Sequence, residues 1–232
     1  IVLLIASLVI TSCEEVIDVK LDTAAPKLVI DASIKWQKGT DGSAQKIFLT
    51  TTTDYYATTI PAATGATVVV TNSTLATPIN YTFIENGQTG EYVCNNFKPI
   101  INNIYTLTVV YKGETYTASS PLMATPDIVK TEQKLKPGFG GKDVYEIKFF
   151  FQDNPSENNF YLGGVKNSTI AYPEYGVISD EFTQGNLMFI VYQEELKKGD
   201  IVDYTLQGIT EKYNNFMFKL ISTSGVEGNG PF

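Results

Sequence analysis

Short runs of β-branched and aromatic residues, separated by turn-forming residues, are the feature that most constrains the fold of this chain. Thr, Val, Ile, Tyr and Phe recur in runs of strand length, and Gly, Pro, Asn and Asp interrupt them, which is typical of antiparallel β structure. Seven short strands over about 95 residues are the number expected of an immunoglobulin-like β-sandwich. In the first half the expected strands span 28–34, 46–51, 66–71, 81–85, 91–94, 104–111 and 114–119.

The turns and the alternation of side chains make this expectation more specific. The dipeptide Asn86-Gly87 suits a tight hairpin turn, and Lys112-Gly113 is expected to turn the chain as well. Successive side chains of a strand point to opposite sides. The expected core side of the 104–111 strand carries Tyr105, Leu107, Val109 and Tyr111.

Proline and glycine mark a boundary in the middle of the chain. The segment 121–126 is bracketed by prolines, and 134–142 contains Pro-Gly and Gly-Gly pairs, so a domain junction is expected near Ile128. Strand composition then returns at 144–151, 160–165, 187–192 and 201–206.

One helix is expected near the end of the chain, over about 211–222, because apolar residues there recur at helical spacing. The predicted fold is therefore all-β. An immunoglobulin-like β-sandwich is expected at 26–127, followed at 128–232 by a second β-rich domain with this one short helix. The last residues, 228–232, have loop composition, and the second domain is expected to be truncated there.

The first fifteen residues resemble the end of a lipoprotein export signal. An apolar run, 1–10, leads through Thr11-Ser12 to Cys13, and it is shorter than the roughly 20 residues that span a bilayer. Small residues before a cysteine suit lipoprotein signal peptidase, so 1–12 is interpreted as a signal remnant and 13–25 as a lipidated tether. The alternative is a buried N-terminal strand or helix in which the cysteine belongs to the core.

The composition excludes several kinds of chemistry. The chain has no histidine, and all 17 basic residues are lysines. A Ser-His-Asp or Cys-His arrangement, an imidazole zinc site and an arginine clamp for carboxylate or phosphate are therefore impossible within this sequence. The net charge of -8 argues against nucleic acid as a partner. An enzyme is not expected, although paired carboxylates or a Ser-Lys pair could still act.

Tyrosines supply the candidate contact residues. Tyr55 and Tyr56 fall in a Thr-rich loop, and Tyr172 and Tyr175 flank a Pro-Glu pair. Loop aromatics can stack on sugar rings or peptide side chains and keep a hydroxyl for hydrogen bonding. The alternatives are rim packing or contact with a partner protein.

Cys94 and two polar segments are expected to have structural rather than functional roles. Cys94 is expected to be a small buried apolar residue. The segment 153–158 offers oxygen ligands of the kind calcium prefers, but it lacks EF-hand spacing and the central glycine. It is interpreted as a solvated turn that begins with an Asx cap, and 197–200 as a surface turn. No metal and no cofactor are expected.

An ordered set of segments resembles a known family. The set runs from Cys13 and the acidic residues that follow it through 26–30, 65–70, 104–109 and 113–118 to 153–161 and 230–232. These segments resemble the lipoproteins of domain-of-unknown-function family 4249 (DUF4249), found in Bacteroidota. The resemblance implies an outer-membrane lipoprotein, often encoded beside a SusC-type TonB-dependent transporter. No catalytic residues are established for that family.

The resemblance also bears on location and function. Glu14 and Glu15 are similar to the acidic signal that sends such lipoproteins to the exterior face of the outer membrane, with a solvated tether as the alternative. The expected function is a non-catalytic binding or gating accessory of a SusC-like TonB-dependent transporter. The alternatives are a self-standing surface adhesin or matrix-binding lipoprotein and, last, a hydrolase with two carboxylates about 5 to 9 Å apart.

Overall fold

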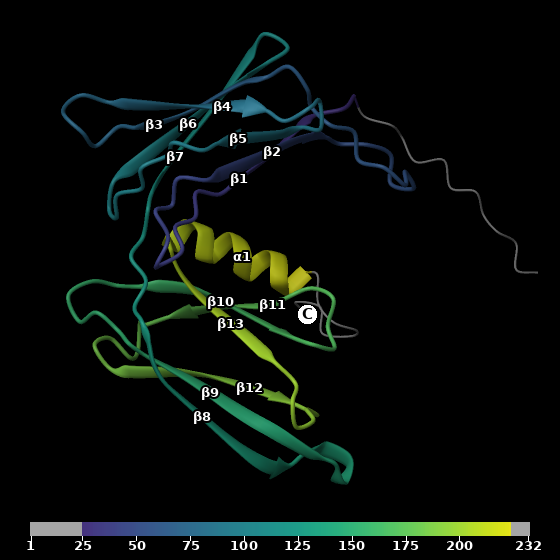
Figure 1. The fold of residues 1–232 in the computed structure, drawn as a ribbon, viewed down its shortest axis with the longest axis vertical. Helices are drawn as coiled ribbons and strands as arrows, with labels where there is room; N and C mark the ends of the chain where they lie inside the picture. Colours follow the sequence, from purple (N-terminus) through teal and green to yellow (C-terminus); the bar gives the residue numbers. More distant parts are fainter. Residues whose placement is uncertain (1–24, 224–232) are drawn as a thin grey trace, which may run out of the picture.

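The computed structural model describes residues 25–223 of the chain. Within that range the chain forms 13 β-strands with a single α-helix, so the predicted all-β class with one short helix is confirmed (Figure 1). The predicted signal remnant and the tether up to residue 24, with Cys13, Glu14 and Glu15, lie outside the described residues, as does 224–232.

All eleven strands predicted from the sequence are present, and so is the helix predicted over 211–222. Two further strands, β8 and β11, were not predicted. In chain order the strands are β1 (Leu28–Ala32), β2 (Gln45–Thr51), β3 (Thr67–Asn72), β4 (Ile79–Glu85), β5 (Glu91–Cys94), β6 (Ile104–Tyr111), β7 (Glu114–Pro121), β8 (Ile128–Pro137), β9 (Asp143–Gln152), β10 (Phe160–Asn167), β11 (Glu174–Ser179), β12 (Leu187–Glu194) and β13 (Val202–Ile209), and the α-helix is α1 (Glu211–Thr223). A short 3-10 helix, η1 (Phe139–Gly141), lies between β8 and β9.

The first seven strands form one antiparallel sheet in the order β1-β2-β5-β4-β3-β6-β7. This sheet curls around a common apolar core, as in a β-sandwich (Figure 1), whereas the immunoglobulin-like arrangement stays a prediction. The predicted core side of β6 is confirmed, because Tyr105 and Val109 are buried while Leu107 and Tyr111 pack against the core. The other buried residues of these strands also alternate along them: Ile47, Leu49, Val68, Val70, Tyr81, Phe83, Tyr92 and Cys94.

A tyrosine hydroxyl and a thiol that enter this core are both paired. The Tyr92 hydroxyl accepts a hydrogen bond from the Ala66 N–H at 2.9 Å and donates one to the Ala63 carbonyl at 3.0 Å. Cys94 is buried as predicted, and its thiol donates to the Asn96 side-chain oxygen. Pairing of this kind removes the free-energy penalty of burying a polar group without a partner.

Both predicted hairpin turns are present, but only one is a two-residue turn. Lys112 and Gly113 have φ values of 49° and 83°, as a type I′ turn requires. The connection predicted at Asn86-Gly87 is longer, since residues 86–90 separate β4 from β5, and Gln88 within it also has a positive φ, of 56°. The strands on either side resume pairing only beyond it.

The remaining strands form two three-stranded antiparallel sheets, β12-β9-β8 and β11-β10-β13. These sheets pack face to face through aromatic rings. Phe149 stacks on Tyr204 with ring centroids 4.4 Å apart, and Phe151 meets Tyr161 edge-on at 5.2 Å. Helix α1 covers the other face of β11-β10-β13 through Met217, so it lies between that sheet and the seven-stranded sheet (Figure 1).

The two strands that the sequence did not reveal are edge strands. β8 includes part of the proline- and glycine-containing segment 134–142, and β11 includes the end of the tyrosine cluster at 172–175, so Tyr175 lies on a strand and not on a loop. An edge strand has a neighbour on one side only and commonly carries charges that discourage pairing with another chain. The three lysines and one glutamate of β8 hide its strand character in this way.

Strand pairing divides at the connection between β7 and β8. The strands β1 to β7 pair with one another, and β8 to β13 pair among themselves. β8 begins at Ile128, where the junction was predicted. That 26–127 and 128–232 fold as independent domains stays a prediction.

The connection between β7 and β8 lies against β13. A Cβ atom at Gly208 would come within 1.8 Å of the Ala124 carbonyl oxygen, so the two backbones are in direct contact. The Gly208 N–H donates to the Thr125 hydroxyl at 2.7 Å. Asp127 of the same connection forms an ion pair with Lys38 of the first half. These contacts hold the connection to both halves of the molecule.

Candidate functional site

Two neighbouring tyrosines extend into solvent from the loop between β2 and β3. Tyr55 is 82% exposed and Tyr56 is 75% exposed, and their rings lie edge to face with centroids 5.0 Å apart. The base of the loop is closed, because the Thr51 N–H donates to the Pro61 carbonyl at 3.0 Å. The loop therefore presents an aromatic pair to solvent, and a hydrogen bond holds its two ends together.

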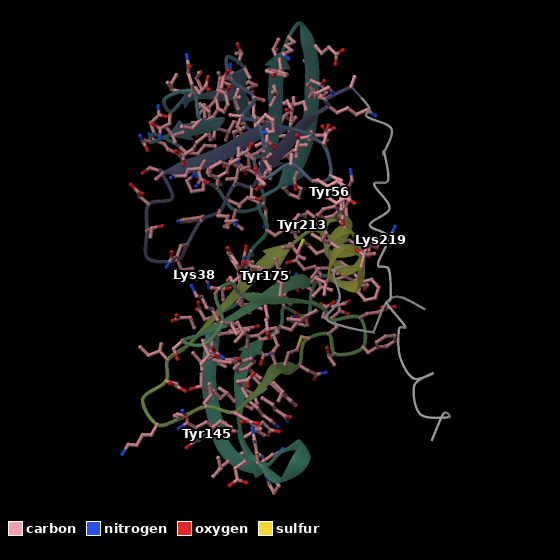
Figure 2. All side chains as sticks on the ribbon, turned by 90° about the vertical axis from the view of Figure 1, so that its right-hand side faces the viewer. Lys38, Tyr56, Tyr145, Tyr175, Tyr213 and Lys219 are labelled. Carbon is pink, nitrogen blue, oxygen red and sulfur yellow. The ribbon has the colours of Figure 1, made fainter. Side chains whose placement is uncertain are left out.

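The second predicted tyrosine cluster is separate from the first and is itself divided. Tyr172 is 83% exposed. Tyr175 is exposed to a lesser degree, at 44%, and one side of its ring covers Gly164, where a Cβ atom would lie 3.0 Å from a ring carbon. Helix α1, which carries Tyr213, packs against β11, which carries Tyr175, and Figure 2 shows both tyrosines where the seven-stranded sheet meets the rest of the molecule. Tyr175 therefore contributes to internal packing as well as to the surface.

Helix α1 adds an exposed apolar surface that was not predicted as a site. Phe216 and Phe218 are 57% and 60% exposed, although Met217 between them is buried. Figures 1 and 2 place the C-terminal end of α1 and the Tyr55–Tyr56 loop on the same side of the molecule. The apolar spacing that predicted the helix does not reveal this exposure, since the same spacing is typical of a buried face.

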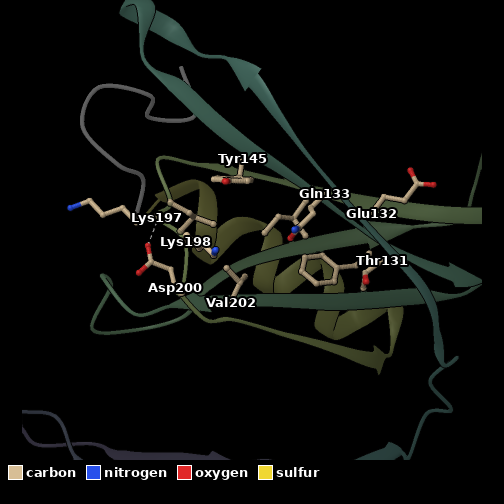
Figure 3. A pocket seen from close by; sticks show the side chains of 12 residues that line it. Thr131, Glu132, Gln133, Tyr145, Lys197, Lys198, Asp200 and Val202 are labelled. Carbon is tan, nitrogen blue, oxygen red and sulfur yellow. Dashed lines mark hydrogen bonds between the residues drawn. The ribbon is translucent and has the colours of Figure 1, made fainter.

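A groove of about 480 Å³ opens between β8, β9 and the turn that joins β12 to β13 (Figure 3). Its floor is apolar and is formed by Tyr145, Ile147 and Phe149 of β9 together with Val202 of β13. Alternate residues of β9 share this inner face of the sheet. The groove therefore exposes part of the apolar layer between the two small sheets.

The rim of the groove is charged. Lys197, Lys198 and Asp200 lie on the β12–β13 turn, and Glu132 lies on β8. The turn is closed by Asp200, whose carboxylate accepts a hydrogen bond from the Lys197 N–H at 2.7 Å (Figure 3). The turn was predicted as ordinary surface, and only the folded chain places it against β9. An apolar floor with both signs of charge at the rim suits a small amphipathic molecule.

A buried tyrosine supports the floor of the groove. Tyr204 stacks on Phe149, and its hydroxyl is buried without a hydrogen-bond partner among the described residues. Burial raises the pKa of Tyr204 above its usual value. The hydroxyl therefore stays protonated at neutral pH and cannot act there as a base.

The described residues thus form an all-β protein with an open groove and exposed aromatic surfaces. The chain belongs to the family described as domain of unknown function (DUF4249), whose model matches residues 14–226. The resemblance inferred from the sequence is therefore confirmed at the level of the family. No curated protein matches the chain.

Proposed function

We propose that this protein is a lipid-anchored protein on the exterior side of the outer membrane, where it binds or gates material for a SusC-like TonB-dependent transporter without catalysing a reaction. The proposed anchor is Cys13, with Glu14 and Glu15 as the surface-export signal. Membership of the family, with a match that begins at residue 14, supports the proposal. In the part of the chain that the structure describes, no helix has the length and apolarity to cross a membrane.

The observation that carries the binding role is the exposed pair Tyr55 and Tyr56. Two aromatic rings more than 70% exposed leave apolar area in water that a partner could cover. Tyrosine is among the residues that dominate binding energy at interfaces, since it combines a large ring with a hydroxyl. The loop base is closed by the hydrogen bond between Thr51 and Pro61, so less conformational entropy is lost on binding.

The groove supplies a second surface, suited to transported material rather than to the transporter. Its volume of about 480 Å³ falls within the range of small-molecule sites. The lysines at 197 and 198 and the carboxylate of Asp200 can orient a polar group above the apolar floor. The proposal therefore assigns the tyrosine loop to the protein partner and the groove to the ligand.

A mild-detergent pull-down from native outer membranes tests the tyrosine loop. The tagged, lipidated protein is expected to recover a TonB-dependent barrel in stoichiometric amount. A Tyr55→Ala/Tyr56→Ala variant is expected to recover at least about tenfold less, since loss of one hot spot costs about 2 kcal/mol.

Phe182→Ala is the matched control, because this side chain is 91% exposed on a different loop. It is expected to recover as much barrel as the unmodified protein. Equal recovery of the barrel by all three proteins would show that the tyrosine loop is not part of the interface. Recovery of the lipoprotein alone, from membranes that contain the intact barrel, would favour the adhesin alternative.

A further inference from the structure

Two aspartates that the proposed function does not use are buried beside each other in the second half of the chain. Asp153 directly follows β9 and is 1% exposed, and Asp180 directly follows β11 and is fully buried. The sequence interpretation of 153–158 as a solvated turn is wrong for Asp153. The Asx cap of that turn is made by Asn154, whose side-chain oxygen accepts from the Ser156 N–H.

The hydrogen bonds to these carboxylates come from neutral groups. Asp153 accepts from the Tyr161 hydroxyl at 2.7 Å and from the Gly185 N–H at 2.8 Å. Asp180 accepts from the Asn159 N–H at 2.8 Å. None of the ion pairs formed within residues 25–223 includes either aspartate.

Two buried oxygen atoms at this position have no hydrogen-bond partner. They are Oδ1 of Asp180 and Oδ1 of Asn159, a residue that is only 8% exposed. Asn159 directly precedes β10 and falls on the same face of that strand as Tyr161, which reaches Asp153. A buried polar atom without a partner destabilises the folded state. Two such acceptors beside a second carboxylate are the arrangement that a cation would satisfy.

From this geometry we infer that Asp153, Asp180 and Asn159 form a calcium site between the loop after β9 and the loop after β11. The site offers carboxylate and amide oxygens, which are the ligands that Ca²⁺ prefers, and it comes from two loops, which suits the flexible coordination of that ion. Among the described residues, no three acidic or cysteine side chains gather as metal ligands. The remaining ligands would therefore be neutral protein oxygens or water.

Thermal unfolding of the full-length lipidated protein in detergent tests this site. After chelator treatment, Ca²⁺ at roughly 100 times its Kd is expected to raise the unfolding midpoint by about 5–10 °C. Calorimetric titration should detect one Ca²⁺ per chain. Asp180→Asn is expected to abolish both effects. Asn159→Ala is expected to weaken Ca²⁺ binding without removing a charge. This second variant keeps the test valid if Asp180→Asn does not fold.

Glu146→Gln is the matched control, because Glu146 is also a buried carboxylate but is paired with Lys134 and Lys136 on the outer face of β9. It is expected to keep the full Ca²⁺ response.

A competing arrangement rotates the Asn159 amide so that its NH₂ group donates to Asp180, and it needs no cation. An unchanged midpoint with Ca²⁺, or a response to Mg²⁺ alone, would overturn the calcium assignment.

Discussion

Replacing Gly208 with alanine should destabilise the protein by about 3 kcal/mol, which lowers its unfolding midpoint by about 6–12 °C. The added Cβ would lie 1.8 Å from the carbonyl oxygen of Ala124 and 2.8 Å from its carbonyl carbon. Backbone atoms cannot rotate away as a flexible side chain can, so the connection between β7 and β8 must move. That movement also strains the hydrogen bond from Gly208 to Thr125.

Gly176→Ala is the matched control for this substitution. Gly176 lies on β11, which pairs with β10 on the side opposite β13, and its added Cβ would meet nothing within 4 Å. Its expected effect is within about 0.5 kcal/mol. Thermal or urea unfolding of the two variants should separate them clearly. Equal midpoints would show that the connection does not pack against β13 as described.

Replacing Cys13 with alanine should abolish attachment to the outer membrane. If Cys13 carries three acyl chains, each buried CH₂ contributes about 0.8 kcal/mol, and the loss removes the whole anchor. The precursor should also stay uncleaved, because the cysteine is the residue at which the signal would be processed. Its apolar segment would then keep it in the inner membrane.

Metabolic labelling with palmitate, followed by separation of inner and outer membranes, measures this effect. The unmodified protein is expected to carry label and to fractionate with the outer membrane. Cys94→Ala controls for the loss of a thiol as such, since Cys94 is buried in the first core. A labelled Cys13→Ala protein in the outer membrane would contradict the lipoprotein proposal.

The sequence predicted most of the fold because most strands have one buried face. Composition revealed these strands, alternation identified the buried side of β6, and helical spacing revealed α1. The strands β8 and β11 lie at sheet edges. They escaped prediction because β8 is rich in charged residues and β11 contains a glycine, so neither has the apolar composition by which the other strands were recognised. The other edge strands, β1, β7, β12 and β13, were predicted from their composition, so it is charge and glycine content rather than edge position alone that hid β8 and β11.

The candidate sites could be predicted only where they are local in sequence. Tyr55 and Tyr56 are adjacent, and the loop composition around them indicated exposure correctly. The groove joins β8 and β9 to a turn some fifty residues later in the chain, which no local pattern reveals. Asp153 and Asp180 are likewise brought together only by strand pairing, because β10 lies between them in sequence and pairs with β11.

Photo-cross-linking at position 56 in intact cells tests the transporter-accessory proposal most directly. A photoreactive phenylalanine analogue in place of Tyr56 keeps an aromatic ring at a side chain that is 75% exposed. Illumination followed by mass spectrometry is expected to give one dominant product, in which the lipoprotein is joined to a TonB-dependent β-barrel. Products that join it only to extracellular matrix or to other copies of itself, in cells that produce the barrel, would contradict the proposal.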